Sequence, residues 1–219
     1  MSGFAGFTPE AVDFLWGIRF NNNRDWFNEH KAQYTDSLYH PMKELAEELF
    51  EPFAAEPGML CKVSRIYKDA RMKPTVPYKE SLWICIRTGA TWWGEEPSLF
   101  FEITPDRYSY GFLLWGPKTT WLEQYRKALA DRPDEFLALA AQVERETGLQ
   151  ISGERYKRPK PCPDERLRPW WDLKHVLAIA EYPIDEQLYT PELADRVRNT
   201  LTALKPLYDW CKRIGTAVE

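Results

Sequence analysis

The sequence predicts an α+β protein: a central antiparallel sheet, built as a meander, with helices packed mainly on one face. Apolar residues recur at helical spacing in the N-terminal part, 8–55, and in the helical and mixed C-terminal part, 118–216, but alternate with polar residues in the sheet core, 60–116. The predicted strands also follow one another through short connections, which antiparallel neighbours allow. We therefore expect one domain, 1–219, with helical segments at both termini and a partly open sheet face, where a functional site would lie.

The N-terminal part carries the signals of successive helices. Thr8 stands where a helix N-cap belongs, and Pro9 occupies the first helical position, where its missing N–H costs nothing. Another helical segment begins after Asn22 and Asn23, and Pro41 is expected to divide it. The apolar positions of that segment are Trp26, Phe27, His30, Tyr34 and Leu38.

The sheet core contains an alternating strand and a hairpin. In "SLFFEITPDRYSYGFLLWG" two alternating runs are joined by the turn residues Pro105 and Asp106, which predicts two antiparallel neighbours. The strand "SLWICIRTG" precedes them, and one of its faces is more polar than the other. Its buried face is expected to hold Leu82, Ile84 and Ile86, and its other face Trp83, Cys85 and Arg87.

One further strand is expected near the C-terminus. The segment "KHVLAIAEYPI" combines Val and Ile, which favour a strand, with alanines, which favour a helix. We interpret residues 175–182 as a strand of the sheet, with a helix as the alternative. Thr190 and Pro191 then begin an amphipathic helix that Pro206 is expected to kink.

Composition excludes some classes of function. The formal net charge of −4 argues against a surface built for nucleic acid, because phosphate binding needs a basic excess, so nucleic acid is not expected as a partner. The chain contains ten Trp, eleven Tyr and eleven Phe, more rings than one core accommodates. Some of these rings are therefore expected to line a groove.

Cysteine and histidine usage predicts no metal site and no cofactor. The four cysteines and three histidines are scattered, without a C-x-x-C pair or an H-x-x-x-H pair. The N-terminus lacks the pattern of a signal peptide, and no apolar run reaches the length of a membrane span. We therefore expect a cytoplasmic protein with reduced thiols and no membrane partner. The pattern does not specify an oligomeric state.

The first candidate site is the basic segment 62–79. Its single acid is Asp69, and Pro74 and Pro77 restrict the backbone that leads to Tyr78. Arg and Lys side chains that converge beside a Tyr hydroxyl can bind a phosphate or a carboxylate. The alternative is a solvated strand edge in which Asp69 bridges a neighbouring arginine. The basic residues are Lys62, Arg65, Lys68, Arg71, Lys73 and Lys79.

A second basic segment, "GERYKRPKPCPDERLRPWWDLKH", interleaves cations with aromatic residues. Such a stretch can bind a nucleotide or a single strand by charge and stacking. The alternative is a surface loop held to the body of the protein by Trp170 and Trp171. The residues of interest are Arg155, Tyr156, Lys157, Arg158 and Lys160.

Signals for other activities are weak. Trp92 and Trp93 precede a Gly and two acids and would form a contact surface if exposed. The chain lacks G-x-G-x-x-G, the P-loop pattern, G-x-S-x-G and H-E-x-x-H. No catalytic dyad follows from the sequence, and Asp69 is the one candidate acid or base.

The motifs "NNNRDWF", "SRIYKDAR", "PYKESLW", "FFEITPDRYSYG" and "YKRPK", spread over most of the chain, resemble a bacterial family of conserved hypothetical proteins called domain of unknown function 2461. Many members have Phe where Met72 stands and an Asp–Lys pair where "KPTV" precedes P-Y-K. The resemblance implies no established activity, and an anion-binding role more readily than a catalytic one. The residues that match its motifs are Arg24, Trp26 and Phe27, then Arg65, Asp69 and Arg71, then Pro77, Tyr78 and Lys79.

Three hypotheses follow. The first is a binding module for a small anionic molecule, with the second basic segment folded over the first. The second is an enzyme acting on a phosphorylated or carboxylated small molecule, with Asp69 as acid or base in a closed pocket. The third is a protein interaction module that uses exposed aromatic residues. The predicted ligand-binding residues are Arg65, Asp69, Arg71, Tyr78, Lys79, Tyr156, Lys157 and Arg158.

Overall fold

The computed structural model of the protein describes residues 3–72, 74–89 and 94–216. Within these ranges five strands form one antiparallel sheet, and each strand pairs with the next along the chain. The α+β fold and the meander are therefore confirmed. The strands are β1 (Met59–Val63), β2 (Leu82–Thr88), β3 (Ser98–Ile103), β4 (Arg107–Leu114) and β5 (Val176–Pro183).

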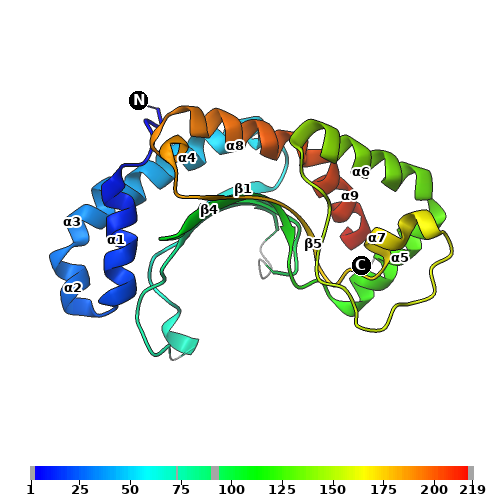
Figure 1. Cartoon of the computed structure of the whole chain (residues 1–219), viewed down its shortest axis with the longest axis horizontal. Helices are drawn as coiled ribbons and strands as arrows, with labels where there is room; N and C mark the ends of the chain where they lie inside the picture. Colours follow the sequence, from blue (N-terminus) through cyan, green and yellow to red (C-terminus); the bar gives the residue numbers. More distant parts are fainter. Residues whose placement is uncertain (1–2, 73, 90–93, 217–219) are drawn as a thin grey trace.

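The sheet arches, and helices cover its convex face and both of its ends (Figure 1). Helix α4 packs on β1 and β2, and α8 packs on β3 and β4. The side beneath the arch is open in this view (Figure 1). The helices are α1 (Pro9–Phe20), α2 (Arg24–Glu29), α3 (Lys31–Gln33), α4 (His40–Phe50), α5 (Thr119–Asp131), α6 (Pro133–Thr147), α7 (Arg168–Trp171), α8 (Glu192–Ala203) and α9 (Lys205–Thr216). The π-helical turn η1 (Tyr34–Tyr39) and the 3₁₀ turns η2 (Glu51–Phe53), η3 (Ala70–Met72), η4 (Glu165–Leu167) and η5 (Glu186–Tyr189) complete them.

Alternation along the strands separates a core face from an open face, as predicted. Leu82, Ile84 and Ile86 are fully buried beneath the helices. The hairpin turns at Pro105 and Asp106, where Thr104 N–H donates to the carbonyl of Arg107 at 2.9 Å. The interpretation of 175–182 as a strand is confirmed by β5, which pairs with β4 over its whole length. The core face is continued by Leu99, Phe101, Ile103, Tyr108, Tyr110, Phe112, Leu114, Val176, Ala178 and Ala180.

Two prolines mark helix boundaries. Pro41 divides the helical segment as predicted: the π-helical turn η1 ends at Tyr39, and α4 begins at His40 with Pro41 in its first turn. Pro206 does not kink a single helix. Helix α8 ends at Ala203, and Pro206 lies in the first turn of α9, where its ring fits.

A glycine in the middle of the sheet is required by its geometry. Gly111 has φ +147°, a backbone conformation that side-chain-bearing residues rarely adopt. A Cβ atom there would lie 2.1 Å from the carbonyl oxygen of Ala178 on the neighbouring strand. Glycine within a strand typically marks a bend or a close approach of two backbones. Gly111 lies between Phe100 and Ile179 in the register, at the centre of the open face.

None of the described helices has the length and apolar character needed to cross a membrane.

Candidate functional site

Residues 64–72 and 74–80 form an arm that leaves the sheet between β1 and β2 and projects on its open side (Figure 1). A bridge between Tyr67 and Tyr78 closes the base of the arm. Two backbone hydrogen bonds support it: Lys68 N–H donates to the carbonyl of Pro77, and Lys79 N–H to that of Ile66, both at 2.8 Å. Backbone hydrogen bonds therefore join the two ends of the first basic segment.

Asn22 holds the arm on the N-terminal helices. Its side-chain oxygen accepts the N–H of Tyr78 at 3.0 Å, and its side-chain nitrogen donates to the carbonyl of Tyr78 at 3.1 Å. The ring of Tyr78 stacks on Phe27 with 4.3 Å between ring centres, and Tyr67 packs against both rings. The "NNNRDWF", "SRIYKDAR" and "PYK" motifs thus meet in one packed unit, and the ring of Tyr78 is buried.

At the tip of the arm, Asp69 and Arg71 bind each other. The guanidinium of Arg71 donates to both carboxylate oxygens, with a shortest distance of 2.6 Å, and the backbone N–H of Arg71 donates to Asp69 as well. These hydrogen bonds hold the pKa of Asp69 at about 2. The side chains of Asp69 and Arg71 are 45% and 89% exposed. Asp69 therefore pairs with Arg71 and not with Arg65, the other arginine near it in the sequence.

We expect an NMR titration of the Asp69 carboxyl to give a pKa near 2 in the wild type and a value near 4 in Arg71→Ala. The pair stabilises the fold above the ordinary carboxyl pKa, and this contribution is lost as the pH falls toward 2. Solvent screening keeps it small, because both groups are exposed. Arg65→Ala is the matched control and should leave the titration unchanged; an equal rise in both variants would contradict the pairing.

The open face of the sheet holds a cavity of about 210 Å³ beside the base of the arm. Trp83, Phe100 and Leu113 supply apolar walls, and Cys85 and Glu102 lie among them. Strand pairing places Trp83 opposite Glu102 and Cys85 opposite Phe100. The full lining is Ser81, Trp83, Cys85, Ser98, Phe100, Glu102 and Leu113.

Cations from β1, β2 and the arm lie beside this cavity. The Lys79 ammonium donates to the carbonyl of Arg65 at 2.6 Å and lies 5.7 Å from the centre of the Trp83 ring. Lys62 is opposite Cys85 in the register, and Arg87 follows on the same face of β2. Burial and the nearby Lys62 both lower the pKa of Lys79. Among the described residues, neither lysine has a carboxylate within ion-pair distance.

The second basic segment forms a loop at residues 155–160, called the basic loop below. The buried Asp172 carboxylate accepts the N–H of Lys160 at 2.9 Å, and the N–H of Tyr156 donates to the Asp172 carbonyl. The Lys160 ammonium lies 5.4 Å from the centre of the Tyr156 ring. A cavity of about 540 Å³ adjoins the loop, and Lys157 and Arg158 are exposed.

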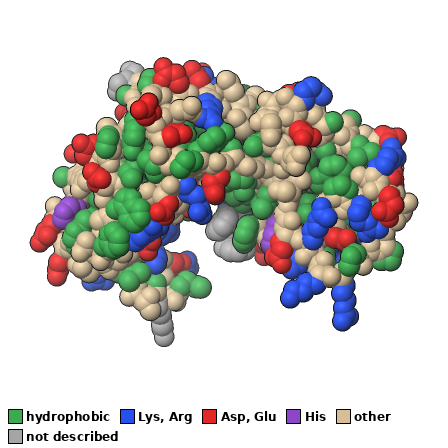
Figure 2. Space-filling view, in the orientation of Figure 1, with side chains coloured by type: hydrophobic (Ala, Val, Ile, Leu, Met, Phe, Trp, Pro, Cys, Tyr) green, Lys and Arg blue, Asp and Glu red, His purple; other side chains and the backbone are tan. Residues whose placement is uncertain are grey.

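The arm and the basic loop lie at opposite ends of the arch, both on its open side (Figure 1). Figure 2 shows the molecule hollowed between two lobes, with Lys and Arg side chains on both. Within the described ranges no hydrogen bond or ion pair joins the two segments. The fold thus places Arg65, Asp69, Arg71 and Lys79 together on the arm and Tyr156, Lys157 and Arg158 on the far side of the hollow, and ligand binding by these residues stays a prediction.

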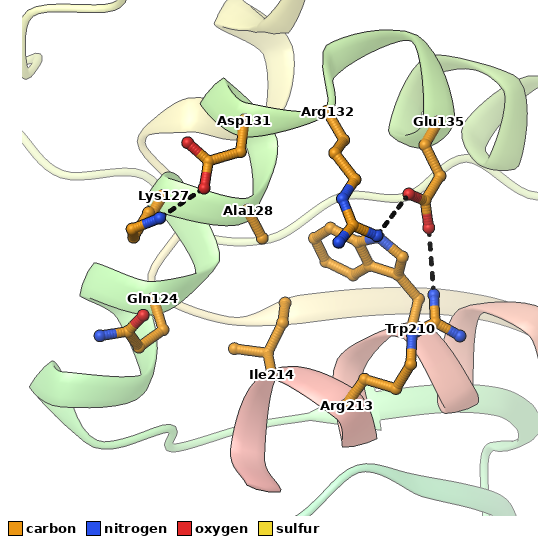
Figure 3. A pocket seen from close by; sticks show the side chains of 9 residues that line it. All are labelled: Gln124, Lys127, Ala128, Asp131, Arg132, Glu135, Trp210, Arg213 and Ile214. Atoms are coloured by element: carbon orange, nitrogen blue, oxygen red, sulfur yellow. Dashed lines mark hydrogen bonds and ion pairs between the residues drawn. The ribbon is translucent and has the colours of Figure 1, made fainter. Parts of the chain in front are cut away.

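Another cavity, of about 260 Å³, lies where α5, α6 and α9 meet (Figure 3). Trp210 and Ile214 form its floor. Its cations already contact carboxylates of the same cavity, so an incoming anion would have to compete with them. The ion pairs are Lys127–Asp131, Arg132–Glu135 and Arg213–Glu135.

The family model of conserved hypothetical protein (DUF2461) matches residues 10–210. The chain belongs to this family. No curated protein matches the chain. In this DUF2461 protein, the motif residues Asn22, Phe27 and Tyr78 build the base of the arm, whereas Asp69 and Arg71 stand at its exposed tip.

Sequence reasoning did not identify the cavity of the open face in this DUF2461 protein. Alternation placed Trp83 and Cys85 on that face, but the register that brings Phe100 and Glu102 beside them is a tertiary property. Trp92 and Trp93, the predicted contact surface, lie outside the described residues, as does Lys73. Among the described residues, no three His, Cys, Asp or Glu side chains come together as metal ligands would.

Proposed function

We propose that the protein binds a small anionic molecule with an apolar or aromatic body on the open face of its sheet, where β1, β2 and β3 meet. One observation carries the proposal. Lys62 and Lys79 flank an aromatic-walled cavity, Lys62 lowers the pKa of Lys79, and in the described parts of the chain neither lysine has a carboxylate within ion-pair distance. Two neighbouring cations repel each other, and a bound anion would remove that cost.

The cavity gives each part of such a ligand a partner. The phosphate or carboxylate would lie between the two lysine ammonium groups. Its apolar body would cover Trp83 and Phe100, whose half-buried and buried rings offer flat contact area. The carboxylate of Glu102 would accept a hydrogen bond from a hydroxyl or amine of the ligand.

The geometry supports a binding role better than acid–base catalysis by Asp69. That hypothesis expects Asp69 partly buried inside a closed pocket, whereas its carboxylate is bound by Arg71 at an exposed tip and does not line the cavity of the open face. We also infer a cytoplasmic location, because the four cysteines are free thiols, as a reducing compartment keeps them.

A thermal-shift screen against phosphate, nucleotides, sugar phosphates and aromatic carboxylates tests the proposal. A ligand that binds the folded state raises the midpoint of unfolding. Each charge-assisted contact contributes about 1.5 kcal/mol, so Lys62→Ala/Lys79→Ala should weaken binding about 100-fold. The matched control Lys31→Ala/Lys43→Ala removes two exposed lysines elsewhere and should bind normally. Equal binding by both double variants would refute the proposal.

A further inference from the structure

We infer that the open face accommodates an extended acidic peptide segment, whose acidic ends reach the arm and the basic loop while apolar residues between them lie on the sheet. This inference rests on the proposed function for its first anchor, Lys62 and Lys79, and adds a second anchor across the hollow (Figure 2). It also defines the class of ligand.

The basic loop supplies the second anchor. No acid occurs between residues 155 and 160, and in the described chain the side chains of Lys157, Arg158 and Lys160 have no carboxylate within ion-pair distance. The loop is held in place by Asp172, and Arg168 donates to the carbonyl of Lys160 at 3.0 Å. Cations on an ordered loop bind an anion with less loss of conformational freedom than cations on a mobile one.

The surface between the anchors carries exposed apolar side chains. Most of the exposed large hydrophobic side chains of the described chain belong to the sheet, to its end or to the arm. Leu113 and Leu177 fill the floor between the exposed residues. Exposed apolar residues gathered on one side of a molecule mark a contact surface. The residues are Leu60 and Ile179 on the sheet, Trp115 stacked on His175 at its end, and Tyr67 and Met72 on the arm.

This floor favours a peptide over a nucleic acid. Leu60, Leu113 and Ile179 offer aliphatic contact, which suits the apolar side chains of a peptide. Glu102 and Glu181 also face the open side and would repel a continuous line of phosphates. A ligand whose acidic groups lie only at its two ends keeps them away from the carboxylates of Glu102 and Glu181.

The width of the sheet sets the length of the segment. The arm leaves between β1 and β2, and Ser152 pairs with Leu177, so the chain leading into the basic loop runs along the outer edge of β5. Neighbouring strands are about 4.8 Å apart, which makes the five-stranded sheet about 19 Å wide. An extended peptide advances about 3.3 Å per residue, so about six residues cross the sheet and about eight include both acidic ends.

The test is fluorescence anisotropy with labelled peptides of about eight residues. A two-ended peptide carries glutamates at both ends and apolar residues between them, and each one-ended peptide replaces the glutamates of one end by glutamine. We expect the two-ended peptide to bind at least about tenfold more tightly than either one-ended peptide, because the second contact becomes intramolecular. Lys157→Ala/Arg158→Ala/Lys160→Ala should remove this advantage, and Lys31→Ala/Lys43→Ala should preserve it.

Three results would overturn the inference, and they separate it from the proposed function. If one-ended and two-ended peptides bind equally and only Lys62→Ala/Lys79→Ala weakens them, the second anchor is wrong and the proposed function stands. If an oligonucleotide of equal charge binds more tightly than the peptide, the peptide assignment is wrong. If Lys62→Ala/Lys79→Ala binds every anion as tightly as the wild type does, both the inference and the proposed function are wrong.

Discussion

Gly111→Ala is expected to destabilise the fold by about 3 kcal/mol or more. The added Cβ would lie 2.1 Å from the carbonyl oxygen of Ala178, an approach that real Cβ atoms do not make. The clash is with the backbone of the neighbouring strand, so no side-chain rotation relieves it. The φ of +147° adds a conformational cost, because it belongs to a region that is accessible essentially only to glycine.

Gly58→Ala is the matched control. Gly58 also has a positive φ, of +74°, but a Cβ there would meet nothing within 4 Å. Its substitution should therefore cost only the conformational term, about 1 kcal/mol. Urea unfolding of the two variants measures both free energies. If both variants lose the same free energy of unfolding, Gly111 is needed only for its φ. The contact with the carbonyl of Ala178 would then cost nothing, because β4 and β5 could move apart.

Asn22→Ala is expected to lower the free energy of unfolding by about 2 to 3 kcal/mol and to detach the arm from the N-terminal helices. The substitution removes the two hydrogen bonds to Tyr78 and leaves a backbone N–H and a backbone carbonyl without their partner. Water can replace part of the loss, since the contact is only partly buried. Amide exchange should accelerate most at the N–H groups of Lys68 and Lys79, which close the base of the arm.

Asn23→Ala provides the comparison, one residue away. The side chain of Asn23 accepts the N–H of Trp26 and caps α2, and it makes no hydrogen bond to the described residues of the arm. Its loss should cost about 1 kcal/mol and leave amide exchange in the arm unchanged. If the arm exchanges faster in both variants to the same extent, the link between Asn22 and the arm is not what holds it in place.

The fold could be predicted from the sequence because local pattern and tertiary environment agree. The period of two in β2 follows from one face being buried under α4, so Leu82, Ile84 and Ile86 could be assigned without a structure. The π-helical turn before Pro41 could not be predicted, because it depends on packing, for which the sequence has no simple signal.

The site was harder to predict, since it depends on which chain segments meet. The hydroxyl of Tyr78 looks available for a ligand in the sequence, yet stacking on Phe27 buries its ring. Asn22 has the signature of a helix cap but holds the arm instead. Both basic segments could be recognised in the sequence. Their separation by the width of the sheet follows only from the strand order.

The most direct test of the account is a crystal structure of the protein with the tightest-binding anion from the screen. We expect its phosphate or carboxylate between the ammonium groups of Lys62 and Lys79, and its apolar body over Trp83 and Phe100. An anion bound instead where α5, α6 and α9 meet, with the open face of the sheet empty, would contradict the account.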